Sequence, residues 1–426
     1  MNELIYKSCV TVLQEELLPA MGCTEPIAVA YAAAMARRTL GEMPDRVEIS
    51  VSGNILKNVK GVVVPGTGGL KGVISAASAG IVAGRDDLQL EVISKVTADD
   101  IVKIKEYMKC AAFEVTQSRS DCIFDIAITV IKNEHSATVR IAGHHTNVVL
   151  IKKDDKVIFS KEIEGEQTAP SGADRSLLSV ENIFEFAQRV ELSDVKELIE
   201  RQIQYNTAIS EEGLKNDYGA RIGKIILKTF GTDIYSRAKA AAAAGSDARM
   251  NGCPLPVVIV SGSGNQGMTA SLPVIEFAKH LNVSYETMLR AVVLSDLITI
   301  HLKTGIGRLS AYCGAVSAGC GAGAAICYLR GGGLAEISAT VDNALAIDSG
   351  LVCDGAKSSC AAKIASAVGG GLLAMEMSLN GSHFAYGDGI MGESVENTIN
   401  NISDMARIGM RSTDEEIIRL MIKNIK

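Results

Sequence analysis

The sequence predicts an α+β fold, in which a mostly helical lobe rich in glycine and alanine carries an inserted α/β lobe with an antiparallel sheet. Strand-like alternation is concentrated between residues 45 and 164, and helical patterns lie on both sides of that segment. At 426 residues, the chain also exceeds the usual size of one domain. We therefore expect a helical domain made of residues 1–44 and 165–426, and an inserted domain made of residues 45–164.

The composition indicates how the helices of this fold pack. Hydrophobic residues make up 47% of the chain, aromatic residues only 4%, and glycine contributes 41 residues. An interior poor in aromatic side chains has to be filled mainly by alanine, valine, isoleucine and leucine. We therefore expect helices that approach one another closely.

Residues 1–40 are expected to be helical, with a break between Pro19 and Pro26 that contains Cys23. Cys23 therefore lies at a kink or at the start of a helix. A helix start favours the thiolate and lowers the pKa of a thiol, so Cys23 is a candidate base. The alternative is a buried cysteine at a helix junction, which residue type alone favours.

The inserted segment begins with alternating residues at 47–51 and 88–96, and a Thr97-x-x-Asp100 capping box then leads into a helix over 101–109. Short polar turns separate the next four expected strands, which are residues 122–131, 136–142, 147–151 and 157–160. This succession predicts an antiparallel meander. We expect His144 and His145 at a strand end, away from the cysteines.

After a polar linker at 164–174, the patterns are helical up to a last helix that is expected to start at a Ser412-x-x-Glu415 capping box. Residues 309–329 carry no charge and are numerous enough to cross a bilayer. They are mostly Gly, Ala, Ser and Cys, without the Leu, Ile and Phe that make insertion favourable. The run therefore predicts a buried helix.

The charge and the cysteine count exclude several classes of protein. A net charge of −7 and a pI near 5.6 make nucleic acid and acidic membrane surfaces unlikely partners. The first residues lack the features of a signal peptide, so we expect a cytoplasmic protein. In that compartment the ten cysteines are expected to be thiols or metal ligands, not disulfides.

Three of these cysteines, Cys313, Cys353 and Cys360, are candidate metal ligands. Cys353 and Cys360 flank a glycine-containing segment that allows two side chains to converge, and no fourth cysteine is nearby. Three thiols of this kind suggest a metal centre with one open position. Cys320 and Cys327 follow Cys313 at seven-residue steps among glycines and alanines, so we expect them to fill space between helices.

Other candidate binding groups lie in turn-rich or helical segments. A glycine-rich loop over 261–267 follows an apolar strand-like run, and backbone N–H groups near Gly264, Asn265 and Gln266 can hold a carboxylate or phosphate. The loop is neither a Walker A motif nor a full Rossmann fingerprint. Asn54 in a polar turn and Lys303 after an apolar run are further candidates, each with a plain structural role as the alternative.

Together, these segments resemble the L-cysteine desulfidase family, which is related to the α-chain domain of iron–sulfur L-serine dehydratases. The resemblance rests on the Gly22-Cys23-Thr24-Glu25-Pro26 motif, Ser52-Gly53-Asn54, the 261–267 loop and the three candidate ligand cysteines. It spans essentially the whole chain, and it implies that the helical domain is the catalytic one.

The resemblance implies a [4Fe-4S] cluster held by Cys313, Cys353 and Cys360, with Cys23 as the proton acceptor. The implied reaction is that of a carbon–sulfur lyase, which converts L-cysteine to sulfide and 2-aminoacrylate, and the latter gives pyruvate and ammonia. It implies no pyridoxal phosphate. Asn54, Gly264, Asn265, Gln266 and Lys303 are expected to bind the amino-acid substrate, and a homodimer is a further expectation.

Two alternatives remain open at the level of sequence. One is a lyase of the L-serine or L-threonine dehydratase type, although the chain ends Lys423-Asn-Ile-Lys426 without the C-terminal active-site cysteine of some of those enzymes. The other is a non-catalytic protein in which the three cysteines hold zinc or a regulatory cluster.

Overall fold

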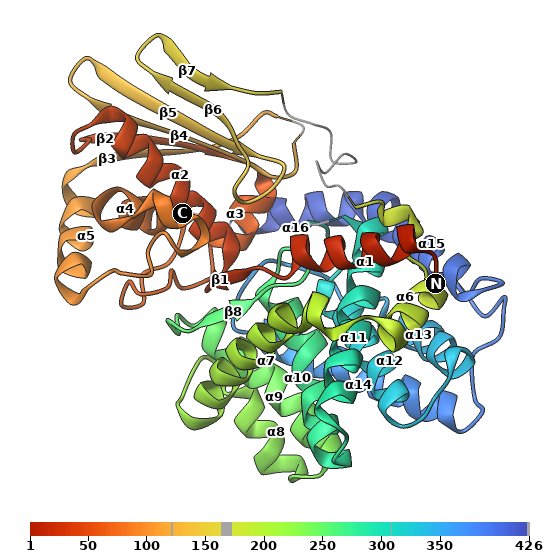
Figure 1. Cartoon of the computed structure of the whole chain (residues 1–426). Helices are drawn as coiled ribbons and strands as arrows, with labels where there is room; N and C mark the ends of the chain where they lie inside the picture. Colours follow the sequence, from red (N-terminus) through yellow and green to blue (C-terminus); the bar gives the residue numbers. More distant parts are fainter. Residues whose placement is uncertain (121, 163–172, 308, 424–426) are drawn as a thin grey trace.

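The computed structural model describes residues 1–426 except 121, 163–172, 308 and 424–426, and it confirms the α+β class (Figure 1). A six-stranded mixed sheet lies at one end of the molecule, and most of the helices form the other part. The expected linker at 164–174 falls mostly outside the described residues. The proposed division into two domains stays a prediction.

The large sheet has the strand order β3-β2-β4-β5-β6-β7. Its strands are β2 (Arg46–Val51), β3 (Ala112–Gln117), β4 (Asp125–Lys132), β5 (His135–Ala142), β6 (Val148–Lys153) and β7 (Lys156–Ser160). The strands from β4 to β7 form the expected antiparallel meander, and β2 joins it antiparallel to β4. β3 adds to β2 in the parallel direction, a pairing that the sequence did not predict.

The meander turns where the sequence places Asn133 and Asp154. These residues have positive φ angles of 53° and 51°, a conformation that Asn and Asp adopt more readily than other residues with a side chain. The polar turns therefore set the hairpins, and the alternating strands between them bury one face.

That buried face rests on α2 (Thr24–Leu40), which packs against β4 and β5. Cross-strand pairs of buried residues such as Ile49 and Ile128 line the contact. α4 (Val73–Ala83) packs on α2 so closely that a Cβ added at Gly80 would lie 2.1 Å from the carbonyl oxygen of Ala30. Most of α2 thus covers the sheet, while its N-terminal end at Cys23 lies near Cys360.

The remaining described elements are mostly helices. In chain order they are α1 (Glu3–Glu16), α3 (Gly53–Val59), η1 (Asp86–Glu91), α5 (Ala98–Cys110), η2 (Arg175–Leu177), α6 (Val180–Arg189), α7 (Leu192–Lys215), α8 (Ile222–Phe230), α9 (Ile234–Met250), α10 (Gly264–Leu281), α11 (Tyr285–Ile306), α12 (Gly314–Leu329), α13 (Leu334–Asp348), α14 (Cys360–Leu379), α15 (Val395–Asp404), η3 (Met405–Gly409) and α16 (Arg411–Lys423). A small antiparallel pair, β1 (Pro19–Met21) and β8 (Pro256–Val258), connects the start of the chain to this helical part.

Three local expectations were wrong. Residues 88–96 form the end of η1 and turns instead of a strand, and the segment around Asn54 is the short helix α3 instead of a turn. Ser412 lies inside α16, which begins one residue earlier, so it is not a cap. In contrast, the uncharged run at 309–329 contains the buried helix α12, as expected.

One described helix, α14, is long and apolar enough to cross a membrane by length and composition alone. Half of its most apolar window is buried inside the molecule. A core helix of a globular protein passes the same test, so this finding is weak evidence for a membrane span.

α12 and α14 cross at glycines, which confirms the close packing that the composition predicts. A Cβ added at Gly319 would lie 2.4 Å from the carbonyl oxygen of Ala367, and one added at Gly371 would lie 2.2 Å from that of Gly319. These neighbours are backbone atoms, which cannot rotate away. The two helices therefore touch through their main chains.

We expect Gly371→Ala to lower the free energy of unfolding by at least about 2 kcal/mol, because the new methyl group forces α12 and α14 apart. Gly369→Ala is the matched control, since its Cβ would meet only Lys239 Cδ at 3.7 Å. Alanine is the better helix former, so the control is expected to gain about 0.5–1 kcal/mol. Denaturant unfolding measures both, and equal effects of the two substitutions would contradict the proposed contact.

Asp296 is a carboxylic acid buried in the middle of α11, with no exposed surface. Gln202 Nε2 donates a hydrogen bond to its Oδ1 at 2.9 Å, and its Oδ2 has no hydrogen-bond partner among the described residues. Burial raises the pKa of Asp296 to about 8, against the smaller opposing effect of Gln202. The side chain is therefore neutral in the folded protein at neutral pH.

We expect the free energy of unfolding to fall as the pH rises from about 4 to about 8, because the folded chain keeps the Asp296 proton that the unfolded chain releases. Asp296→Asn removes this dependence. Its stability relative to the wild type should increase by about 1–3 kcal/mol between pH 5 and pH 8. Urea unfolding at several pH values measures the difference, and a difference that is constant with pH would show that Asp296 does not titrate in this range.

Candidate active site

Cys23 occupies the N-cap position of α2, so the expected helix start is confirmed. Gly22 precedes it with a φ of 58°, and a Cβ at Gly22 would collide with Pro65 Cγ at 1.9 Å, so only glycine fits there. The Cys23 side chain is 3% exposed, and its Sγ–H donates a hydrogen bond to Glu25 Oε2 at 3.1 Å. The thiol is thus held inside the protein at the positive end of a helix.

Burial controls the ionisation of this thiol. It raises the pKa of Cys23 well above the ordinary range, the negative charge of Glu25 raises it further, and the positive charge of Arg249 opposes both. The expectation that the helix start lowers this pKa was wrong, because desolvation outweighs the helix end. A thiolate formed here is a stronger base than an ordinary cysteine thiolate.

Glu25 is oriented by its neighbours. Thr24 Oγ1 lies 3.1 Å from both Glu25 Oε2 and the carbonyl oxygen of Gly262, so its single proton is shared between these two acceptors. Asn58 Nδ2, from α3, donates to Glu25 Oε1 at 3.1 Å. These bonds fix the carboxylate beside the Cys23 thiol and join the starts of α2 and α10 with α3.

Two of the three candidate ligand cysteines lie at helix starts, and the third lies in the loop between α13 and α14. Cys313 is the N-cap of α12, Cys360 is the first residue of α14, and Cys353 precedes α14. A short antiparallel contact joins the segments that contain Cys313 and Cys353. The Cys313 amide donates to Leu351 O at 3.1 Å, and the Cys353 amide donates to Ala311 O at 2.6 Å.

The three thiols are close enough to influence one another's ionisation. Burial raises the pKa of Cys313 to about 12, and the nearby thiols of Cys353 and Cys360 contribute to the rise. Lys363 lies close to them; burial opposes its protonation, but the carboxylate of Asp354 and the thiols of Cys313 and Cys360 raise its pKa. The Lys363 ammonium group can therefore offset the negative charge of thiolates in this region.

The three candidate ligands are thiols, the donors that hold iron–sulfur clusters. Among the described residues, no three His, Cys, Asp or Glu side chains stand close enough together to hold one metal ion. All three candidate thiols are free of disulfides and lie within electrostatic reach of one another. A four-iron cluster is wider than a lone zinc ion and binds thiolates that are farther apart.

Cys23 and the candidate metal ligands belong to one region. Cys23 packs in a small buried cluster with Val62 and Met250, and Cys360 and Ala356 pack against the same cluster. The structure therefore brings together two thiols that are separated by most of the chain, as the resemblance implied.

The glycine-rich loop at 261–267 lies beside this cluster. It turns through Ser261 and Gly262, with φ angles of 48° and 77°, and α10 begins at Gly264. Its N-cap residue makes no side-chain cap, so the amides of Gly264, Asn265 and Gln266 have no intrahelical partner. A Cβ added at Gly314 would lie 2.6 Å from Gln266 Cδ, which places the Gln266 side chain next to the first turn after Cys313.

The other expected binding residues are buried. Gln266 Oε1 and Asn54 Oδ1 have no hydrogen-bond partner among the described residues, and buried amide oxygens of this kind are usually paired. Lys303 is 5% exposed near the end of α11. The structure thus places Gln266 beside the thiols, while the roles of Asn54 and Lys303 stay predictions.

Sequence reasoning missed two residues near the site. Arg249 is a buried arginine at the end of α9, preceded by the alanine run 240–244, and a lone arginine after such a run is a usable signal. His145 was expected away from the cysteines, but its Cε1 would lie 3.4 Å from a Cβ at Gly262, so it borders the glycine-rich loop. Its position depends on a contact between sheet and helices that no local pattern encodes.

Several helix starts face this region without side-chain caps. The N-cap residues of α2, α10, α12 and α14 make no side-chain cap bond. The first amides of such helices carry partial positive charge and seek acceptors. The contacts described above connect these starts to one another, so the region is suited to anionic groups.

A buried ion pair ties the last helix to the same region. Lys57 Nζ, on α3, lies 2.5 Å from Asp414 Oδ1 on α16, and the Lys57 side chain is 1% exposed. Lys57 Nζ also lies 3.5 Å from the carbonyl oxygen of Cys353. One ammonium group therefore links α3, α16 and the loop that carries a candidate ligand.

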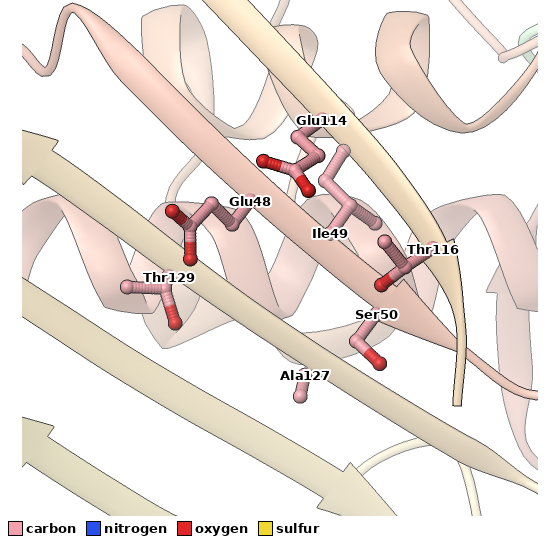
Figure 2. A pocket seen from close by; sticks show the side chains of 7 residues that line it. All are labelled: Glu48, Ile49, Ser50, Glu114, Thr116, Ala127 and Thr129. Atoms are coloured by element: carbon pink, nitrogen blue, oxygen red, sulfur yellow. The ribbon is translucent and has the colours of Figure 1, made fainter. Parts of the chain in front are cut away.

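A hollow on the outer face of the sheet is separate from this site (Figure 2). It has a volume of about 130 Å³ and is lined by residues of β2, β3 and β4. Its two carboxylates, Glu48 and Glu114, both pair with Arg46. None of the residues that line the hollow is a cysteine or a cation, so we assign it no role.

Comparisons with known proteins identify the family to which the chain is similar. A family model described as serine dehydratase alpha chain matches residues 87–419, a region that contains the three candidate ligand cysteines, the glycine-rich loop and Arg249. Cys23 and Asn54 lie before the matched region.

Whole-length relatives carry the family name UPF0597. The chain is 54% identical to the UPF0597 protein DSY1109 of Desulfitobacterium hafniense over 419 residues, covering 98% of this chain and 97% of the relative. It is 49% identical to a UPF0597 protein of Lachnoclostridium phytofermentans, covering 98% and 100%, and 44% identical to one of Treponema denticola, covering 98% of each. These names state no activity.

We expect Cys313→Ala, Cys353→Ala and Cys360→Ala each to lower the iron content of anaerobically reconstituted protein at least about tenfold, because each removes one of three thiolates. Cys320→Ala is the matched control, since Cys320 lies seven residues after Cys313 and is buried inside α12 at 1% exposure. Iron and acid-labile sulfide analysis measures the outcome. Normal iron content in any of the three variants would remove that cysteine from the ligand set.

Proposed function

This chain belongs to the serine dehydratase alpha-chain family, and we propose that it is an iron–sulfur lyase that cleaves L-cysteine to sulfide, ammonia and pyruvate. The family is one of lyase-type enzymes that use an iron–sulfur cluster. The choice of L-cysteine as substrate, the [4Fe-4S] form of the cluster and the roles of individual residues are the proposal.

One observation carries it. A buried thiol at a helix start, Cys23, packs in the same small cluster as Cys360, one of three neighbouring thiols that fit a cluster. A base and a metal centre so close together can act on adjacent carbon atoms of one small substrate. When bound, the cluster would supply a Lewis acid that stabilises the departing sulfur.

Cys23 is proposed to take the proton from Cα of the substrate onto its Sγ, while the electron pair of the Cα–H bond forms the double bond and sulfide leaves Cβ. The raised pKa of Cys23 suits this role, since the Cα proton is weakly acidic and a strong base is needed. Glu25 Oε2, which accepts the Cys23 hydrogen bond, is placed to receive the thiol proton beforehand. The product 2-aminoacrylate then tautomerises and hydrolyses to pyruvate and ammonia.

The remaining residues bind and orient. The uncapped amides at the start of α10 would stabilise negative charge on the substrate, and the Gln266 side chain beside Cys313 would contact it. Asn54 and Lys303 are proposed as further substrate contacts. A free amino acid as the partner, a homodimer and a cytoplasmic location are also proposed, while the acidic charge balance argues against nucleic acid as a partner.

L-serine is the second candidate substrate, because the matching family is described as serine dehydratase alpha chain. The chemistry would be the same, with hydroxide instead of sulfide as the leaving group. A non-catalytic protein that holds zinc or a regulatory cluster is the remaining alternative.

The test is to offer anaerobically reconstituted protein L-cysteine and L-serine in separate reactions, and to measure sulfide and pyruvate. Sulfide with an equal amount of pyruvate is the expected result. Pyruvate from L-serine alone would make the protein a dehydratase. Neither product from protein with a full complement of iron would refute the proposed lyase activity.

We expect Cys23→Ala to lower kcat at least about 10³-fold while leaving the iron content unchanged, because it removes the base but not a ligand. Cys253→Ala is the control, since Cys253 is equally buried and lies outside the proposed machinery. If Cys23→Ala lost iron together with activity, Cys23 would be a ligand and its role as base would be refuted.

A further inference from the structure

Arg249 is a buried cation that has no anionic partner within the described part of the chain. Its side chain is 2% exposed, and it is the largest of the fully buried side chains among the described residues. Among the described residues, it forms no ion pair, and its one hydrogen bond runs from Nη1 to Asn265 Oδ1 at 3.1 Å. A buried charge is normally paired, since desolvation costs several kcal/mol per ion. An anion that the protein itself does not supply is therefore expected beside Arg249.

The unused donors of Arg249 share one edge of the guanidinium group. Its Nε is buried and has no hydrogen-bond partner among the described residues. A Cβ added at Gly264 would lie 2.5 Å from this Nε, so only glycine lets the start of α10 lie this close to the guanidinium group. With Nη1 occupied by Asn265, the Nε–Nη2 edge remains for a ligand.

This edge lies in the region of the proposed base. The positive charge of Arg249 is close enough to Cys23 to oppose the rise in that pKa. Met250, the next residue, packs directly in the cluster that contains Cys23. Asp247, two residues earlier on α9, accepts a hydrogen bond from the Gly223 amide instead of pairing with Arg249.

The chemistry of the edge selects the ligand. Two parallel N–H groups of a guanidinium match the two oxygens of a carboxylate, and such bidentate pairs are stronger and more directional than single charged hydrogen bonds. The neighbouring start of α10 offers further N–H donors to the same anion.

We infer that Arg249 binds the α-carboxylate of the amino-acid substrate through its Nε–Nη2 edge, and that Asn265 positions the guanidinium by holding Nη1. This inference deepens the proposed function and rests on it for the identity of the substrate. Binding in this way would hold Cα of the substrate near Cys23. It also gives Asn265 a role different from the one expected from the sequence, since its side chain acts through Arg249.

The test uses L-alanine, which has the amino-acid skeleton but no leaving group, and L-alaninamide, which lacks the carboxylate. Binding to reconstituted wild-type protein is measured by calorimetry and by the shift in thermal unfolding. L-alanine is expected to bind at least about tenfold more tightly than L-alaninamide. Equal binding of the two would overturn the inference.

Two variants test Arg249 itself. Arg249→Gln is expected to weaken L-alanine binding at least about tenfold while the iron content stays unchanged. Asn265→Asp keeps the arginine but puts a carboxylate where Asn265 Oδ1 now accepts from Nη1 at 3.1 Å. That internal carboxylate is expected to compete with the ligand, so this variant should fold stably and also bind L-alanine at least about tenfold more weakly. Arg237→Gln, on the same helix and paired with Glu276 near the surface, is the matched control and should bind normally.

The outcomes separate this inference from the proposed function. Unchanged L-alanine affinity in the folded Asn265→Asp and Arg249→Gln proteins would overturn it, even if the wild type releases sulfide from L-cysteine. Loss of iron from Arg249→Gln with normal L-alanine binding would also overturn it, because Arg249 would then serve the cluster. If the variants lose L-alanine binding but the wild type forms neither sulfide nor pyruvate, the carboxylate site stands and the proposed lyase activity fails.

Discussion

Main-chain contact between α12 and α14 is the constraint on which the arrangement of the thiols depends. Gly319 lies six residues after Cys313 and meets Ala367, which lies seven residues after Cys360. Gly323 meets Gly371 at the next crossing, again at nearly equal distances from the two helix starts. The two helices therefore run parallel, and their first residues, where Cys313 and Cys360 lie, are at nearly the same height along the helix axes. Larger side chains at these crossings would separate the two thiols.

Desolvation is the second theme of the site. Burial raises the pKa of Cys23 and Cys313, and it would make their thiolates costly without compensation. The structure provides that compensation through helix starts and Lys363. Charges of both signs therefore lie in one buried region, where the low dielectric strengthens the interactions between them. Such a site is suited to bind a small charged substrate and to exclude water from it.

Local patterns predicted the features that depend on local physics. The hairpins follow from Asn133 and Asp154, and the start of α2 follows from Gly22 and the flanking prolines. α3 was expected to be a turn and residues 88–96 a strand, because segments this short contain too few residues for the apolar pattern to identify the structure. β3 was missed although Phe113 and Val115 alternate with polar residues, because the run is short and its residues are mostly exposed. The pKa of Cys23, the position of His145 and the isolation of Arg249 depend on packing between distant segments, which no local pattern contains.

The buried pair of Lys57 and Asp414 has a consequence for the history of such chains. Replacing either residue alone would leave a charge inside the protein without its counterion, next to the carbonyl of Cys353. Substitution at one of these positions is therefore tolerable only when the other changes with it. Positions 57 and 414 should vary as a pair among homologous chains, which ties the evolution of the carboxyl-terminal helix to that of the thiol-bearing loop.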